Sequence, residues 1–215
     1  MATSMKTYQA AIFDLDGTLI DSSQAIVAST LAALDELGWK RISEAQITAH
    51  IGYKLEAVFP KRTPEERRHL VDTIGRHYDG ICAEQTALYP GVEELILGLS
   101  GRGVPLGVVT SKRRGHTETI LEALGLRSAF SVVVASDDVA NMKPDPEGLR
   151  MAAQSLGVAP ADCLYVGDTR VDVETARGAG TAIAGVAWGT DGIGTLRYHG
   201  IDHEIPNAGA LATLF

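Results

Sequence analysis

Short Val-rich segments alternate with helical segments through the second half of the chain. Strands are expected at 105–110, 130–136, 163–168 and 181–188. Helical patterns lie between them, at 115–126, 146–158 and 171–180. Apolar strands separated by helices of about ten residues predict a parallel sheet covered by helices on both faces. With a buried strand at 8–13 and a short strand and helix in 202–215, the fold class is α/β, a doubly wound parallel sheet.

The stretch between residues 21 and 88 breaks this alternation and contains no strand candidate. Its apolar residues recur at helical spacing, and Thr63 followed by Pro64 is a good helix start. We therefore expect one strand, then an all-helical insertion at 20–84, then the remainder of the α/β domain. The core would comprise 1–19 and 85–215.

Charge and composition exclude several classes of protein. The chain has 215 residues, 45% of them hydrophobic, and a net charge of −8. This acidic balance argues against binding to nucleic acid, which needs many Lys and Arg. The first ten residues lack an apolar signal region, and no apolar run reaches the ~18 residues of a membrane span, so neither export nor membrane insertion is expected. Two distant cysteines, Cys82 and Cys163, suit inert thiols in a cytoplasmic protein. Oligomeric state stays open.

Polar constellations follow the predicted strands where a parallel sheet places its ligand sites. Each alone has a simpler interpretation as a turn, a helix cap or a surface lysine. Their occurrence together, in this order, favours a functional site instead. They are Asp14-Leu15-Asp16-Gly17-Thr18, Thr110-Ser111-Lys112, Lys143-Pro144-Asp145-Pro146 and Gly167-Asp168-Thr169-Arg170-Val171-Asp172.

The chemistry of these groups fits magnesium-assisted phosphoryl transfer. Asp14 and Asp16, two residues apart in extended chain, can face one pocket, with Gly17 permitting a sharp exit. Mg²⁺ prefers oxygen ligands, and an aspartate can attack phosphorus once nearby cations neutralise the phosphate. Thr110 and Ser111 offer hydroxyls where a phosphate could be held. A second carboxylic acid can exchange protons with the leaving group and with water.

The motifs resemble those of the haloacid dehalogenase superfamily of hydrolases, in the branch that includes phosphoglycolate phosphatases. The resemblance covers essentially the whole chain and implies a Rossmann-like core with an inserted helical cap. The matching segments are Phe13 to Leu19, Val109-Thr110, Lys143-Pro144 and Gly167-Asp168 through Asp172.

This resemblance also implies roles for individual residues. Asp14 would be the nucleophile and a Mg²⁺ ligand. Asp16 would be the general acid and base, with its backbone carbonyl also on the metal, and Asp168 would complete the protein ligands. Two further residues, Thr110 and Lys143, would hold the transferring phosphoryl group.

Three supporting residues follow from the same resemblance. Gly17 and Thr18 would support the loop, with backbone N–H groups available to phosphate. Asp172 would lie behind the metal ligands or contact a metal-bound water. The helical insertion would be a mobile lid that excludes water when it closes.

The substrate is less well defined than the reaction. An acid at Asp16 argues against carbon–halogen cleavage, and Lys54 and Lys61 are interpreted as surface or substrate-contacting residues rather than Schiff-base lysines. The segment 51–53 resembles a cap loop of phosphoglycolate phosphatases, whereas 136–139 and 184–189 resemble pyrophosphatases of the same branch. We expect a small phosphomonoester similar to phosphoglycolate. Pyrophosphate, a sugar phosphate, mutase activity and a catalytically idle binding protein are the alternatives.

Overall fold

The computed structural model describes residues 7–53 and 55–215, and it contains the predicted parallel sheet. All neighbouring strands pair in parallel, in the order β5-β4-β1-β6-β7-β8. After β1 the chain adds β4 and β5 on one side of the sheet and then β6, β7 and β8 on the other side. The point at which the strand order reverses in this way holds the ligand in open α/β sheets. The strands are β1 Ala10–Phe13, β4 Leu106–Val109, β5 Val132–Val134, β6 Cys163–Gly167, β7 Ala182–Val186 and β8 His203–Ile205.

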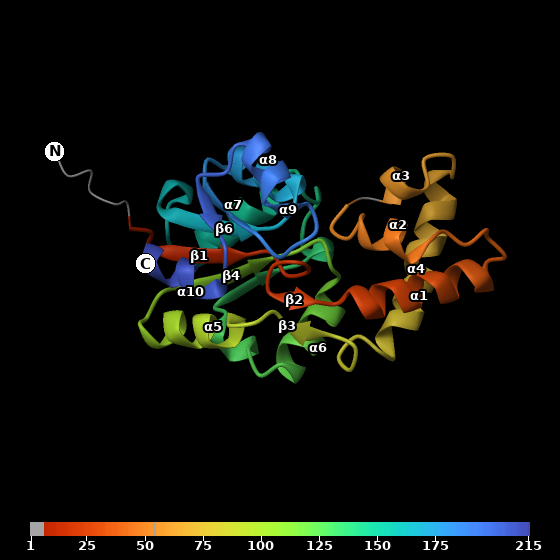
Figure 1. Cartoon of the computed structure of the whole chain (residues 1–215), viewed down its shortest axis with the longest axis horizontal. Coiled ribbons are helices and arrows are strands. Elements are labelled where there is room, and N and C mark those ends of the chain that lie inside the picture. The colour runs from red at the N-terminus through yellow and green to blue at the C-terminus, as the bar shows by residue number, and fades with distance from the viewer. Residues whose placement is uncertain (1–6, 54) are drawn as a thin grey trace.

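Helices cover both faces of this sheet, as predicted (Figure 1). Alternate residues of β1 explain the two layers. Ala11 and Phe13 pack with α5 (Val92–Gly101), α6 (Arg114–Ala123) and α10 (Ala208–Leu211). Ala10 and Ile12 point the other way and pack with the second layer. That layer consists of α7 Glu147–Leu156, α8 Arg170–Ala179 and α9 Gly192–His199.

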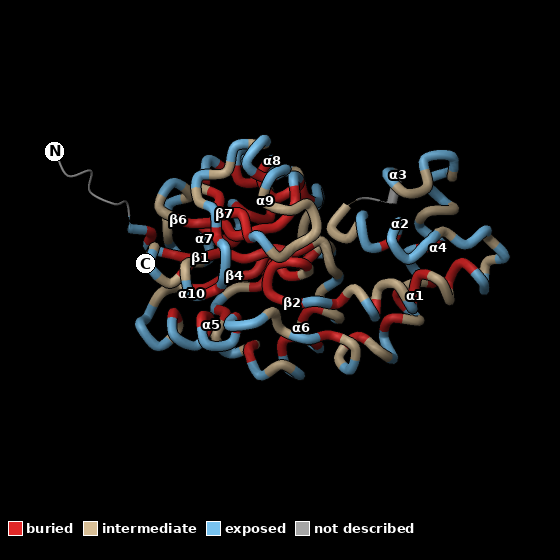
Figure 2. The backbone as a smooth tube through the Cα atoms, viewed as in Figure 1, coloured by how far each residue is buried: buried red, intermediate tan, exposed pale blue. Residues whose placement is uncertain are grey.

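Four helices lie between the first strand and the rest of the core, and they form a separate lobe at the right of Figure 1. Figure 2 shows that this lobe carries less buried chain than the sheet region. Its small apolar centre includes Leu34 of α1 and Leu70 of α4. The predicted helix start at Thr63 is confirmed, with a capping box between Thr63 and Glu66. The helices are α1 Ser23–Glu36, α2 Glu44–Thr48, α3 Leu55–Val58 and α4 Pro64–Asp79.

The sequence patterns missed several short elements. A two-stranded antiparallel ribbon, β2 (Ile20–Asp21) with β3 (Ala87–Leu88), joins the ends of the helical insertion. Two residues are too few to show a strand period. Helix α9 was also missed, because Gly192 and Gly194 weaken its helical signal. Short 3₁₀ turns occur at Arg127–Ala129, Ser136–Asp138, Pro160–Asp162 and Ala212–Leu214.

Cys82 and Cys163 are both buried, and their thiols are free. Within residues 7–53 and 55–215, none of the helices combines the length and apolar character needed to cross a bilayer. The first six residues and Lys54 lie outside the described residues, so the expectations that concern them stay predictions. Lys61 is exposed in the turn before α4.

Candidate active site

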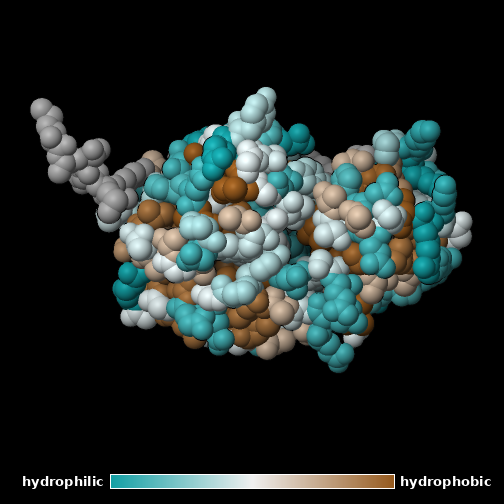
Figure 3. Space-filling model, in the orientation of Figure 1, coloured by the Kyte–Doolittle hydropathy of each residue, from teal (hydrophilic) through white to brown (hydrophobic). Residues whose placement is uncertain are grey.

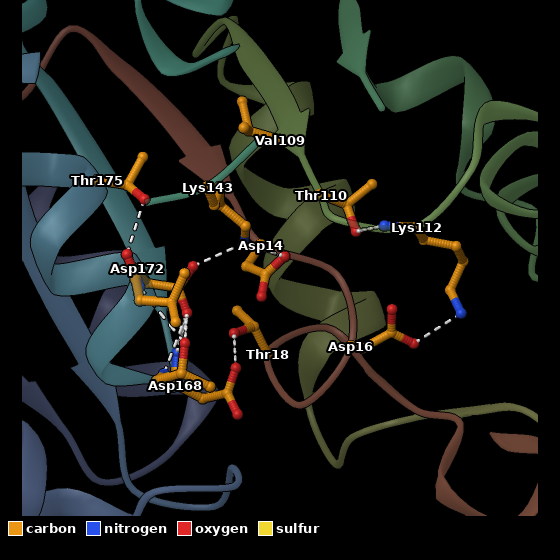
Figure 4. A network of polar contacts seen from close by, with 12 residues as sticks. Asp14, Asp16, Thr18, Val109, Thr110, Lys112, Lys143, Asp168, Asp172 and Thr175 are labelled. Atoms are coloured by element: carbon orange, nitrogen blue, oxygen red, sulfur yellow. Dashed lines mark hydrogen bonds and ion pairs between the residues drawn. The ribbon is translucent and has the colours of Figure 1, made fainter. Parts of the chain in front are cut away.

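Side chains from four segments converge beyond the carboxyl ends of the central strands (Figure 4). Asp14 directly follows β1, Thr110 follows β4 and Asp168 follows β6. Asp172 comes from the first turn of α8, and Lys143 from the loop before α7, where its bond to Pro144 is cis. Each of these five side chains is buried. The structure therefore brings together residues that are as much as 158 positions apart in the sequence.

Lys143 is the centre of this polar cluster. Its Nζ lies 2.8 Å from Asp14 Oδ1 and 2.7 Å from Asp172 Oδ1, and it donates to Tyr165 Oη at 3.2 Å. Burial alone would lower the pKa of Lys143, but the two carboxylates outweigh that effect and raise it well above its usual value. Lys143 therefore stays protonated and fixes the orientation of Asp14.

Asp172 is engaged on both oxygens. Oδ1 accepts from Lys143 and from Tyr165 at 3.0 Å, and Oδ2 accepts from the hydroxyl of Thr169 at 2.7 Å and its N–H at 3.1 Å. Burial would raise the pKa of Asp172, but the bonds from Lys143 and Thr169 lower it. Since its lone pairs are used in this way, Asp172 is suited to supporting the site rather than binding a ligand directly.

Asp14, Asp168 and Asp172 form a cluster of carboxylates that fits a divalent cation. One oxygen from each lies within 4.8 Å of the others. Burial and the neighbouring carboxylates raise the pKa of Asp14 well above its usual value, and that of Asp168 to about 7. Three buried acids face the single cation of Lys143, so negative charge is in excess. An oxygen-only set of this charge suits Mg²⁺, with Asp14 and Asp168 as its candidate ligands.

These pKa shifts predict how stability depends on pH and on Mg²⁺. Between pH 4 and 7 the folded protein retains a proton on Asp168 that the unfolded chain releases, and the raised pKa of Asp14 acts in the same direction. Without metal, their contribution to the free energy of unfolding should therefore fall, on the order of a few kcal/mol, as pH rises through this window. Mg²⁺ would bind the ionised carboxylates, so it should raise the unfolding temperature by several degrees at pH 7.5 and less at pH 5.

Differential scanning calorimetry with EDTA or with Mg²⁺ at the two pH values measures this effect. Asp168→Asn is the matched control, because it should unfold at the same temperature with and without Mg²⁺. An equal response to Mg²⁺ in the wild type and in Asp168→Asn at pH 7.5 would contradict the metal assignment.

Gly17 and Thr18 shape the loop around Asp168. The Thr18 hydroxyl donates to Asp168 Oδ1 at 3.0 Å, and the N–H of Thr190 donates to Oδ2 at 2.8 Å. Gly17 has φ +83°, and a Cβ there would lie 2.2 Å from Asp168 Oδ2. Its N–H donates to the carbonyl of Ile20 at 2.9 Å. This N–H is therefore not available to phosphate, contrary to the expectation from the sequence. The loop needs this bond to reverse direction, and Gly17 contributes space instead.

Asp16 points away from the carboxylate cluster and toward Lys112 (Figure 4), so a pocket shared with Asp14 stays a prediction. Its Oδ1 accepts a hydrogen bond from Ser22 Oγ and lies 3.1 Å from Lys112 Nζ. The backbone N–H of Lys112 donates to the hydroxyl of Thr110 at 3.1 Å. The ammonium group of Lys112 is therefore held by the acid beside it.

Cavities open between the core and the helical insertion, where the face in Figure 3 is hollowed, and two of them lie beside the candidate site. The smaller, about 260 Å³, has mostly apolar walls and includes Asp16, Ser111 and Lys112. The larger, about 720 Å³, includes Lys143 and Ser111. It is also lined by four arginines, Arg67, Arg68, Arg113 and Arg170.

The segment 51–53 faces these cavities, and the Tyr53 hydroxyl donates to Asp191 Oδ2 at 2.6 Å. Asp191 also accepts from the backbone N–H of Arg170 at 2.7 Å. The bond from Tyr53 to Asp191 thus joins the insertion directly to the core.

Sequence reasoning missed Tyr165. Its hydroxyl lies 3.2 Å from Val109 O and contacts both Lys143 and Asp172. A signal was present, because Tyr165 is the one phenol within an otherwise apolar buried strand, and a buried hydroxyl needs a partner. The partners of Lys112 and Tyr53 were not predictable, because they lie far away in the sequence.

The chain is similar to proteins of a known family. The family model for haloacid dehalogenase-like hydrolases matches residues 11–186, which span the cluster at the strand ends. The chain belongs to this family. The protein is a hydrolase of the phosphatase kind. The motif resemblance of the sequence is thereby confirmed.

Relatives and solved structures agree with this assignment. Phosphoglycolate phosphatase from Escherichia coli K12 is 32% identical over 202 residues, covering 82% of this chain and 80% of the relative. The Salmonella typhimurium enzyme is 32% identical over 210 residues, covering 86% and 83%. A haloacid dehalogenase-like hydrolase from Bacteroides fragilis superimposes with a TM-score of 0.89 at 29% identity, covering 95% of this chain and 99% of that one. The confirmed fold is therefore the Rossmann-like core of this hydrolase family.

Proposed function

We propose that the protein is a Mg²⁺-dependent phosphatase that hydrolyses a small phosphomonoester through an aspartyl-phosphate. The observation that carries this proposal is the buried Asp14 carboxylate, oriented by Lys143 at the switch point of the sheet and clustered with Asp168 and Asp172. A carboxylate held by a lysine, beside an acidic set suited to Mg²⁺, is equipped to attack phosphorus.

In the first step, an oxygen of Asp14 forms a bond to phosphorus as the bond from phosphorus to the leaving oxygen breaks. Lys143 and the Thr110 hydroxyl would bind the transferring oxygens, and Asp16 would give its proton to the leaving oxygen. Mg²⁺, held by Asp14, Asp168 and the Asp16 carbonyl, would supply positive charge against the phosphoryl group.

In the second step, a water attacks the phosphorus of the aspartyl-phosphate. Asp16, now ionised, takes a proton from this water, and the bond between Asp14 and phosphorus breaks. Inorganic phosphate leaves with Asp14 restored as a carboxylate. One residue can serve both steps because it alternates between its acid and base forms.

The surroundings support a small, anionic substrate. The cavity of about 260 Å³ beside Asp16 is large enough for a modest leaving group only. The neighbouring cavity concentrates arginines in a chain of net charge −8, although Arg113 pairs with Asp72 and Arg170 with Glu174. We infer that residues 20–84 act as a cap over the site and that these arginines attract a second anionic group, such as the carboxylate of phosphoglycolate.

Arg68 provides a test of this second anion site. Arg68→Gln should raise KM for phosphoglycolate about tenfold, a loss of ~1.4 kcal/mol, with kcat little changed. KM for p-nitrophenyl phosphate, which lacks a distal anion, should stay within about twofold. Lys61→Gln removes an exposed cap cation outside both cavities and is the matched control. Equal changes in KM for both substrates would argue against an anion site at Arg68.

The proposed function is tested by comparing kcat/KM for phosphoglycolate, pyrophosphate and sugar phosphates in the presence of Mg²⁺. We expect phosphoglycolate or a similar small monoester to be preferred. Preference for pyrophosphate would make the protein a pyrophosphatase, and isomerised product in the presence of a sugar bisphosphate would make it a mutase. Absence of phosphate release from every substrate would indicate a binding protein and refute the proposal.

A further inference from the structure

Lys112 is a buried cation that the two steps above do not use. Its side chain is only 8% exposed, and its Nζ lies 3.1 Å from Asp16 Oδ1 and 2.8 Å from the hydroxyl of Tyr78. The same nitrogen lies 4.4 Å from the centre of the Tyr78 ring. A buried ammonium group needs such partners, because its loss of hydration is costly. Both contacts therefore restrict where Lys112 can lie.

We propose that Lys112 is a positioning residue that orients the carboxyl group of Asp16 for proton exchange and connects it to the root of the cap through Tyr78. This inference rests on the proposed function, since it assigns Asp16 the proton transfers. Lys112 itself would touch neither phosphorus nor the leaving oxygen.

The first support is that both polar contacts of Asp16 fall on one oxygen. Ser22 Oγ donates to Oδ1, and Lys112 Nζ lies against the same atom. Because both contacts hold Oδ1, a proton bound by this carboxyl group would sit on Oδ2. The arrangement thus assigns Oδ2 to proton exchange and fixes its direction. Asp16 also lines the smaller cavity, where a leaving group would be.

The second support is the position of Tyr78. It lies in the last turn of α4 and is only 3% exposed within the apolar core cluster that also contains Cys82. The chain returns from the cap to the core just after this turn. Tyr78 is thus anchored where the cap joins the core, and its hydroxyl holds the lysine that holds Asp16. The contact between Lys112 and Tyr78 joins residues 34 positions apart in the sequence.

A direct contact with substrate is the competing role for Lys112, because it also lines the smaller cavity. The two roles predict different kinetics. Losing a substrate contact would lower kcat/KM by a similar factor for every phosphomonoester. Losing the orientation of a proton donor would matter most where the leaving oxygen is basic and needs a proton, and least where it leaves readily as an anion.

The experiment measures kcat/KM of Lys112→Met for a series of phosphomonoesters of increasing leaving-group pKa, with Mg²⁺ present. Phosphoglycolate, with a basic alkoxide, should lose about 30- to 100-fold, and p-nitrophenyl phosphate less than about fivefold. Log kcat/KM should therefore fall more steeply with leaving-group pKa than in the wild type. Each slope is internal to one protein sample, so partial misfolding does not change it.

Three further variants sharpen the test. Lys112→Arg keeps a cation within reach of Asp16 and should restore the wild-type slope. Tyr78→Phe removes the hydroxyl but keeps the ring, and should steepen the slope by a smaller amount. Arg76→Met removes a cation that pairs with Glu36 near the same end of α4, and should leave the slope unchanged.

The outcomes separate this inference from the proposed function. An equal loss for all substrates, or no loss, in Lys112→Met would overturn the positioning role while leaving the phosphatase intact. A steeper slope in Lys112→Met, together with a wild-type slope in Lys112→Arg, would support the positioning role. If Asp16→Ala hydrolysed phosphoglycolate as fast as the wild type, the proton transfers assigned to Asp16, and with them this inference, would be refuted.

Discussion

Replacing Asp14 with Asn should lower kcat for phosphoglycolate by at least about 10⁴-fold, because the amide keeps the shape of the side chain but cannot attack phosphorus. Steady-state phosphate release with Mg²⁺ measures this loss. The effect should be one of chemistry and not of folding. Burial raises the pKa of Asp14 well above its usual value, so its charge opposes folding near neutral pH.

Calorimetry of the same variant is the control. In EDTA at pH 7.5, Asp14→Asn should unfold at the wild-type temperature or above it. An inactive variant that unfolds several degrees lower would suggest a structural defect instead. Turnover within tenfold of the wild type would rule out an aspartyl-phosphate on Asp14.

Lys143→Met is expected to affect both stability and catalysis. The lysine side chain is 5% exposed and lies between Asp14 and Asp172, so its removal leaves two buried carboxylates without their cation. Breaking a buried ion pair in this way costs about 3–5 kcal/mol in the free energy of unfolding. Activity should fall at least about 10³-fold in protein that remains folded, because Asp14 loses its orientation and the phosphoryl group loses a positive charge. Urea denaturation and phosphate release measure the two effects.

A second substitution distinguishes the two effects. In the double variant Lys143→Met with Asp172→Asn, one of the unpaired charges is removed, so part of the lost stability should return. Activity should not return, since neither new side chain can neutralise phosphate. If activity recovered together with stability, Lys143 would be structural only.

Much of this arrangement is visible in the sequence because it depends on local pattern. The alternation of apolar strands and helices gave the order of elements in the core, and polar residues at strand ends pointed to Asp14, Thr110 and Asp168. Parallel strands bring their carboxyl ends to one edge of the sheet, so residues far apart in the chain meet without any detail of packing being known. Lys143 was found in the same way, from its place before a helix.

The fine geometry of the site depends on contacts that no local pattern records. Lys112 stands next to hydroxyls suited to phosphate, yet its ammonium group pairs with Asp16 and Tyr78. The N–H of Gly17 is used within its own loop, and the space Gly17 leaves is filled by Asp168.

By itself, therefore, the sequence determined the fold class, the family and the residues proposed for the reaction centre. Only the tertiary structure decided which oxygen of Asp16 is held and which cation orients each acid. It also showed which arginines border the space between core and cap. The physical reason is that periodicity specifies where an element ends, whereas the partner of a side chain depends on how distant elements pack.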